Sequence, residues 1–184
     1  MVIHPLFVHF PVALLSLYAF LELFRFRKLV ESNSWFNTKL ILLITGTLGA
    51  LATLKTGELD AESKGEAFLE SAVFKLHESA AELTTAIFIF ITALYFIRWL
   101  IREDLHEKIF AFLAIPSESA IRKIFAFFSG ILRLVVETPL ILLFALFGLS
   151  ALLLTGALGG ILVYGPDADP ITRVLFDFLS LTSL

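Results

Sequence analysis

The sequence contains no cysteine and few charged residues, and each shortage excludes a class of protein. Without cysteine the chain forms no disulfide, no iron–sulfur cluster, no thiolate zinc site and no covalently attached c-type haem. Charged residues fill only 17% of the 184 positions, against about 25% in an ordinary globular chain. The net charge of −3 offers no basic surface for phosphates. A secreted disulfide scaffold and a nucleic-acid binder are therefore excluded.

Apolar residues are abundant instead, at 58% of the chain with 20 phenylalanines. A helix needs about 20 mainly apolar residues to cross a bilayer, and lipid tolerates helices rather than open strands. We predict one all-α domain over residues 1–184, an integral membrane four-helix antiparallel bundle without an evident tandem repeat. The expected spans cover residues 5–24, 35–56, 71–100 and 138–164.

The link over residues 105–136 is long and is not predicted to span the membrane. Its apolar residues recur every three or four positions, which predicts an amphipathic helix lying in the membrane interface. Such a helix braces the membrane surface or offers a docking face to a partner subunit. The repeating apolar positions are Ile121, Ile124, Phe125, Phe128, Ile131, Leu132 and Val135.

Basic residues predict the orientation, because cytoplasmic links carry an excess of Lys and Arg. Ten of the 14 fall on the links between spans one and two and between spans three and four. The opposite side is acidic, with five acids between Glu58 and Glu70. We expect a bacterial inner membrane protein with both termini in the periplasm and the amphipathic segment in the cytoplasm.

Histidine is the candidate functional residue. His4 and His9 lie at the outer end of the first span, and His77 near the outer end of the third, whereas His106 lies on the cytoplasmic side in a charged, solvent-exposed setting. Ionisable residues are costly inside a membrane and mark functional sites. Spans one and three are diagonal in such a bundle, about 11–14 Å apart. This gap suits a haem b with His9 and His77 as axial metal ligands and His4 at the rim.

Four glycines at the same outer level have two interpretations. Small residues let a flat macrocycle approach the backbone, or they serve only helix packing. We predict that they line the cofactor: Gly57, Gly156, Gly159 and Gly160.

Two rival functions remain open beside a haem-binding electron-transfer subunit. His4, His9 and His77, helped by Glu78, would bind copper or zinc if spans one and three were adjacent. Alternatively the chain is a cofactor-free scaffold of a respiratory or photosynthetic complex. We find no nucleotide-binding loop, nucleophile elbow or zinc-protease motif. An electron-transfer or accessory subunit is thus favoured over a stand-alone enzyme.

Several of these segments resemble one bacterial family. They are "HPLFVHFPVALL" at the start, Thr56–Gly57, the single His77, and "TGALGGILVYG" near the end. The chain is similar to the predicted membrane proteins called domain of unknown function 2231. This resemblance implies four helices. It also implies that His4, His9 and His77 belong to the family pattern and that His106 does not. Members are often associated with c-type cytochromes or other redox components. The resemblance implies such partners, and the acidic segment would dock a periplasmic cytochrome.

Overall fold

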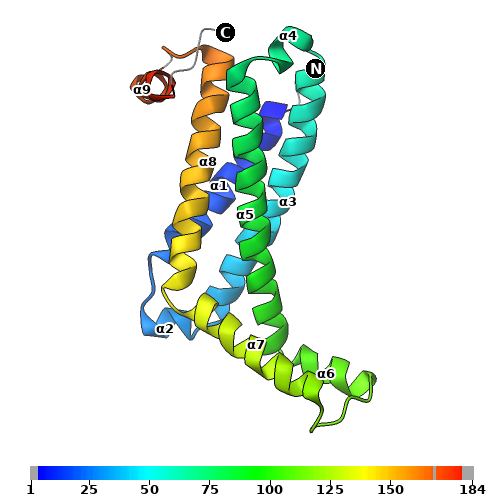
Figure 1. Ribbon diagram of the computed structural model, residues 1–184. Coiled ribbons are helices and arrows are strands. Elements are labelled where there is room, and N and C mark those ends of the chain that lie inside the picture. The colour runs from blue at the N-terminus through cyan, green and yellow to red at the C-terminus, as the bar shows by residue number, and fades with distance from the viewer. Residues whose placement is uncertain (1–3, 168, 180–184) are drawn as a thin grey trace.

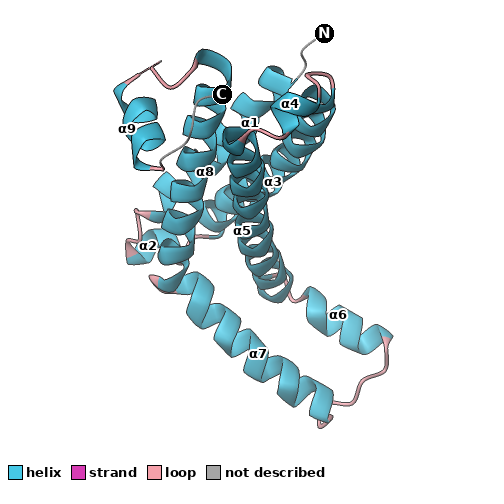
Figure 2. Cartoon of the chain, turned by 45° about the horizontal axis from the view of Figure 1, so that its top comes forward, coloured by secondary structure: helices cyan, strands magenta, loops and turns pink. Residues whose placement is uncertain are grey.

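The computed structural model describes residues 4–167 and 169–179, and this part of the chain consists of helices and short connections (Figures 1 and 2). The helices are α1 (His4–Glu22), α2 (Arg27–Val30), α3 (Asn33–Glu62), α4 (Glu66–Leu69), α5 (Ala72–Arg102), α6 (Leu105–Phe112), α7 (Ala120–Glu137), α8 (Leu140–Tyr164) and α9 (Pro170–Phe178). The four expected spans correspond to α1, α3, α5 and α8, and the link over 105–136 to α6 and α7.

Local sequence explains where the long helices begin and end. The Ser71 hydroxyl accepts a hydrogen bond from the Phe74 amide, and Ser32 and Ser119 cap α3 and α7 in the same way. A serine at this position satisfies an amide that the helix itself cannot. Helix α8 ends at Gly165, whose φ of 85° suits glycine alone. Serine side chains therefore set the starts of α3, α5 and α7, and a glycine sets the end of α8.

Three described helices are long and apolar enough to cross a membrane, namely α3, α5 and α8. The apolar part of α1, Phe7–Glu22, is shorter. Length and composition thus support three of the four expected spans by themselves.

The four long helices run side by side in alternating directions (Figure 1). Helix α1 packs on α3 and α8, and α5 packs on the same two neighbours. Helices α1 and α5 are therefore diagonal, as the sequence predicts. We call the end where α1 begins and α8 ends the histidine end, and the opposite end the ion-pair end.

Aromatic rings fill the centre between the diagonal helices. The fully buried Tyr18 of α1 meets Phe88 and Tyr95 of α5 edge to face, with ring centroids 6.5 and 5.8 Å apart. Phe36 of α3 stacks on Tyr95 at 5.1 Å. Edge-to-face aromatic pairs add about 0.5–1.5 kcal/mol beyond the area they bury. The two helices thus touch through large side chains although their axes are diagonal.

Helices α6 and α7 extend away from the bundle at the ion-pair end (Figures 1 and 2). One face of α7 is apolar and largely exposed. Near the histidine end, α9 lies against α8 through Leu175 and Phe176. The exposed apolar side chains of α7 include Ile121, Ile124, Phe127, Phe128, Ile131 and Leu134.

Helices α1 and α3 form one antiparallel hairpin, and α5 and α8 form a second. Equivalent contacts occur in both hairpins, although the sequence shows no tandem repeat. In α1 and α3, His4 packs on Gly57 and Leu15 packs on Gly46. In α5 and α8, His77 packs on Gly159 and Phe88 packs on Gly148. In every helix the two positions are eleven residues apart, about three helical turns, so they share a face. We infer that the two hairpins are related by an approximate two-fold axis along the bundle.

Candidate functional site

His77 is held between α5 and α8. Its Nδ1 lies 3.0 Å from the Thr155 carbonyl oxygen, and its Cε1 lies 3.2 Å from the position of a Cβ on Gly159. A carbonyl only accepts hydrogen bonds, so Nδ1 carries the proton. In the neutral ring Nε2 then holds a lone pair. The half-buried imidazole is thereby fixed in its orientation by α8.

His4 is held in the corresponding place between α1 and α3. Its Nδ1 lies 3.3 Å from the Thr56 hydroxyl, and its Cε1 lies 3.0 Å from the position of a Cβ on Gly57. The Thr56 hydroxyl donates to the Thr53 carbonyl at 3.1 Å. It therefore accepts from His4 Nδ1, and Nε2 again holds the lone pair.

The two imidazoles lie at the same end of the bundle. They occupy equivalent places in the two hairpins, each against a glycine and a threonine of the neighbouring helix. Metal-ligating histidines almost always donate their second ring nitrogen to a carbonyl or another acceptor, which fixes the ring and its tautomer. The histidine end thus offers two oriented nitrogen donors on diagonal helices.

His9, which the sequence pairs with His77, lies on a different face of α1 from His4. Its side chain is exposed, and five residues after His4 it lies about 140° round the helix. The two histidines of α1 therefore cannot share a face. His4 lies on the face of α1 that contacts α3.

The glycines divide into two kinds. Gly57 and Gly159 are needed for close approach, since the histidine rings occupy the space that a Cβ would need. An added Cβ on Gly156 meets nothing within 4 Å, and one on Gly160 meets only the Thr172 methyl at 3.7 Å. Gly57 and Gly159 thus lie directly against the imidazole rings, whereas Gly156 and Gly160 do not.

The ligand set of a bare metal ion is absent from the described residues, where no three His, Asp or Glu side chains are close enough together to hold one. The expected set of His4, His9, His77 and Glu78 is therefore not assembled.

A buried ionic cluster lies at the other end of the bundle. Glu22 is fully buried, and Lys39 Nζ and the Tyr95 hydroxyl both contact its Oε1, the lysine at 2.8 Å. Arg25 donates to Oε2 at 2.5 Å. Helices α1, α3 and α5 thus meet at one carboxylate. A buried charge survives only when it is paired and hydrogen-bonded, which Glu22 is.

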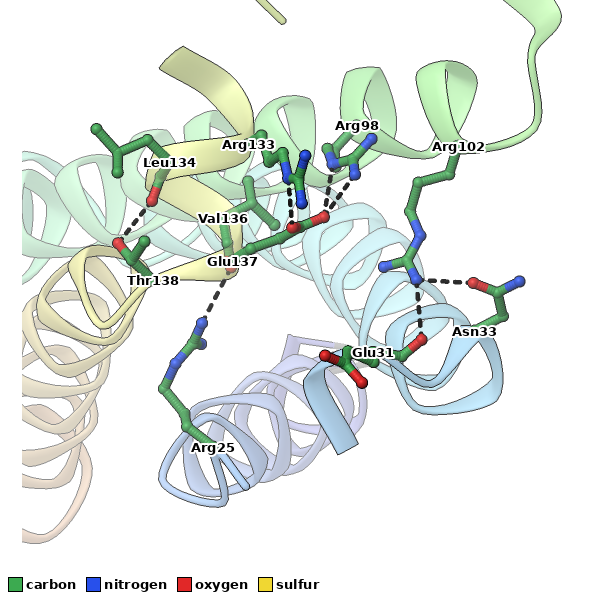
Figure 3. Close-up of polar contacts among 10 residues, drawn as sticks. All are labelled: Arg25, Glu31, Asn33, Arg98, Arg102, Arg133, Leu134, Val136, Glu137 and Thr138. Atoms are coloured by element: carbon green, nitrogen blue, oxygen red, sulfur yellow. Dashed lines mark hydrogen bonds and ion pairs between the residues drawn. The ribbon is translucent and has the colours of Figure 1, made fainter. Parts of the chain in front are cut away.

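Arginines extend this cluster to α7, as Figure 3 shows. Arg25 donates to the Val136 carbonyl at 3.2 Å, and Arg98 donates to Glu137 through Nε at 3.0 Å. The carboxyl of Glu137 also accepts from Arg133. Burial alone would raise the pKa of Glu137, but the hydrogen bonds and charges of Arg98 and Arg133 prevail and lower it. The C-terminal end of α7 is therefore fastened to the bundle.

His106 is not the solvent-exposed residue that its charged neighbours predict. Its ring stacks on Phe125 of α7 with centroids 5.0 Å apart and meets Phe110 edge to face. Its Nδ1 is buried and has no hydrogen-bond partner among the described residues. Folding α6 against α7 creates this environment, which the sequence around His106 does not indicate.

The role of Glu22 is not among those expected from the sequence. Two signals were available. Lys39 occurs near the corresponding end of the next span, and Tyr95 lies near the end of the third, so all three share one level of an antiparallel bundle. An acid and a base at one depth in neighbouring spans predict a buried pair.

Comparison with known families finds a match over most of the chain. The model of the family described as predicted membrane protein (DUF2231) matches residues 1–167. The chain belongs to this family. Comparison with curated proteins and with solved structures finds no match. The family places the protein in a membrane and assigns no activity.

Proposed function

We propose that this protein is a haem b-binding electron-transfer subunit of the bacterial inner membrane, in which His4 and His77 would hold the haem. The single observation that carries the proposal is the pair of equivalent imidazoles, each with Nδ1 bonded to a neighbouring helix. The donor chemistry fits a haem, because two neutral imidazole nitrogens on diagonal helices are what such an iron accepts. His4 thus takes the place first assigned to His9.

The chain's own residues prepare this site before any cofactor binds. Thr155 and Thr56 fix the ring orientations, and Gly57 and Gly159 allow the rings to lie against the helices. When bound, the haem would supply one-electron chemistry. A zinc or copper site is less favoured, because it needs the third ligand that the described residues do not bring together.

The membrane arrangement is part of the proposal. Helices α1, α3, α5 and α8 span the bilayer with both termini in the periplasm, and α7 lies in the cytoplasmic interface with its apolar face in lipid. The distribution of Lys and Arg and the exposed apolar side chains of α7 support this arrangement.

A periplasmic c-type cytochrome or another membrane redox subunit would be the electron partner. The acidic segment supports this assignment only in part, because Glu58, Asp60 and Glu70 form ion pairs with lysines. Glu62 and Glu66 are exposed and are not in those pairs. Electrostatic attraction of a basic partner would therefore rest on these two residues.

Haem content tests the proposal directly. The full chain is purified in mild detergent as wild type, His4→Ala, His77→Ala and His9→Ala, and the pyridine haemochrome is measured for each. We expect haem in the wild type and in His9→Ala, and loss of more than nine-tenths of it in the other two. A colourless wild type overturns the proposal, and stoichiometric metal or stable co-purifying subunits in that preparation would point to the metal-binding or scaffold function.

A further inference from the structure

Two ionisable side chains lie on the outside of the bundle at equivalent places in the two hairpins. His9 lies five residues after His4 on α1, and Glu82 has the same spacing from His77 on α5. Both side chains are exposed, and neither makes a hydrogen bond or an ion pair within the described part of the chain. Because the spacing is equal, the two groups lie at one depth, about 7.5 Å of helix from the histidine end.

Glu82 lies within the apolar part of α5. Fifteen uncharged residues separate it from Arg98 near the ion-pair end. This distance is about 24 Å of helix, less than the apolar core of a bilayer at about 30 Å. Ionisable residues inside a membrane are costly and almost always pair with another group. The described residues of the same copy offer Glu82 no such group, so its partner comes from a neighbouring molecule.

The outward faces of α1 and α5 are complementary in charge and in size. Four residues beyond His9 and Glu82 each face has an exposed alanine, Ala13 on α1 and Ala86 on α5. Eleven residues beyond, the exposed side chain is large on α1, Phe20, and small on α5, Ala93. Positions four and eleven residues apart share one face of a helix. Each face therefore matches the other at three successive levels.

A second copy of the chain satisfies both faces at once. Helices α1 and α5 both begin at the histidine end, so α1 of one copy lies parallel to α5 of the next when both copies have the same orientation in the membrane (Figure 1). His9 then meets Glu82 of the next copy, and an imidazole N–H donates to a carboxylate whether or not the ring is charged. The alanines let the two helices approach closely. Two α5 faces would instead oppose like charges, which is unfavourable.

We propose that the protein assembles with further copies of itself through the outward face of α1 on one copy and that of α5 on the next, with His9 hydrogen-bonded to the neighbouring Glu82. The two faces lie on opposite sides of the bundle because α1 and α5 are diagonal. A contact between different faces links copies into a row or a ring and does not close as a two-fold dimer. The inference uses the membrane arrangement of the proposed function but does not depend on the haem.

Disulfide cross-linking in the membrane tests the proposal, and a chain without cysteine is a suitable background for it. The full-length double variant Ala13→Cys/Ala86→Cys is oxidised in membranes and separated on a non-reducing gel. We expect a ladder of dimers, trimers and larger species, because a disulfide forms only when two Cα atoms come within about 7 Å. Ala13→Cys alone should give no dimer, since this alanine meets a different residue of the next copy.

The matched control is Leu48→Cys/Ser150→Cys on the exposed surfaces of α3 and α8. Each of these residues is nine positions from the glycine that contacts a histidine, as each alanine is from the histidine itself, so the depth is the same. We expect at least tenfold less cross-linked protein than in the alanine pair. Equal cross-linking of the two pairs, or as much dimer from Ala13→Cys alone, would overturn the proposal.

Exchange of the ionisable groups tests the chemistry of the contact. In the Ala13→Cys/Ala86→Cys background, His9→Glu sets two carboxylates against each other and Glu82→His sets two imidazoles. We expect each change to lower the cross-linked fraction at least fivefold. The two changes together exchange donor and acceptor between the faces and should restore cross-linking. A combined variant that cross-links no better than either single change would overturn the pairing.

The outcome is separate from that of the haem measurement. A colourless protein that forms the expected ladder would overturn the proposed function and leave this inference standing. A haem-containing protein in which the alanine pair cross-links no more than the control would overturn this inference alone.

Discussion

The two ends of the bundle use polar residues in opposite ways. At the histidine end, two rings lie on opposite hairpins, and each is fixed by one neighbouring helix through a threonine and a glycine. At the ion-pair end, charged groups from three helices converge on one carboxylate, Glu22. The first arrangement leaves its nitrogen lone pairs available to a ligand. The second satisfies its charges internally.

The approximate two-fold relation sharpens this difference. Glu22 of α1 occupies the place that Tyr95 holds in α5, and Arg25 the place that Arg98 holds. At the histidine end both hairpins have histidine, whereas at the ion-pair end Glu22 corresponds to Tyr95, which contacts it, and arginine occurs in both hairpins. Two identical imidazoles are suited to the haem proposed above, whereas paired charges hold neighbouring helices together. We therefore expect substitutions at the two ends to affect different properties.

The largest effect on stability is expected from Glu22→Leu. This change leaves Lys39 and Arg25 buried without their counter-charge, which costs about 3–5 kcal/mol in comparable cases. Unfolding of the detergent-solubilised protein measures the loss. Glu22→Leu combined with Lys39→Met should recover much of it. Equal loss in the single and double variants would show that the cluster does not act through charge pairing.

Gly57→Val and Gly159→Val should each destabilise the histidine end. The new side chain would occupy the place of the imidazole ring, and overpacking of this kind costs about 1–3 kcal/mol. We expect haem content to fall with it, as the pyridine haemochrome would show. Gly156→Val is the control, since the space around that glycine is open, and it should retain its haem.

Arg98→Gln should loosen α7 without affecting the histidine end. It removes the principal ion pair of Glu137, in which both side chains are largely buried, and we expect a loss of about 1 kcal/mol. Faster hydrogen exchange of the amides near Val136 measures the release. Unchanged exchange there would mean that packing alone holds α7.

Lowering the pH should also loosen α7, but less than Arg98→Gln does. The pKa of Glu137 is below its ordinary value of 4.5 in the folded protein, so its contribution is present at neutral pH and is lost as the pH falls through the lowered pKa. Protection of the α7 amides should therefore decline below about pH 4.5. Glu137→Gln should abolish this pH dependence, and a dependence that persists would have to come from another group.

The smallest effect is expected from His9→Ala. An exposed side chain contributes little, usually within about 0.5 kcal/mol. Stability and haem content should both match the wild type. Loss of haem in this variant would restore the pairing of His9 with His77 and would remove His4 from the proposed ligand set.

The sequence by itself determined the helices and their alternation. Long apolar runs cannot satisfy their backbone in lipid except as helices, and serine, glycine and proline set their ends. The expected segments therefore end within two residues of the ends of α5 and α8, whereas α3 continues six residues further than expected. The sequence also identified His77 and the glycines Gly57 and Gly159 as members of one level. These features depend on neighbours along the chain.

Only the tertiary structure decided which side chains meet. The choice of His4 over His9 depends on the rotation of α1 about its own axis, which packing against Gly46 and Gly57 sets. The burial of Glu22 and of His106 depends on helices distant in sequence, α3 and α5 for the first and α7 for the second. A helix exposes every face equally until a neighbour covers one, so the sequence of one helix cannot specify its partners.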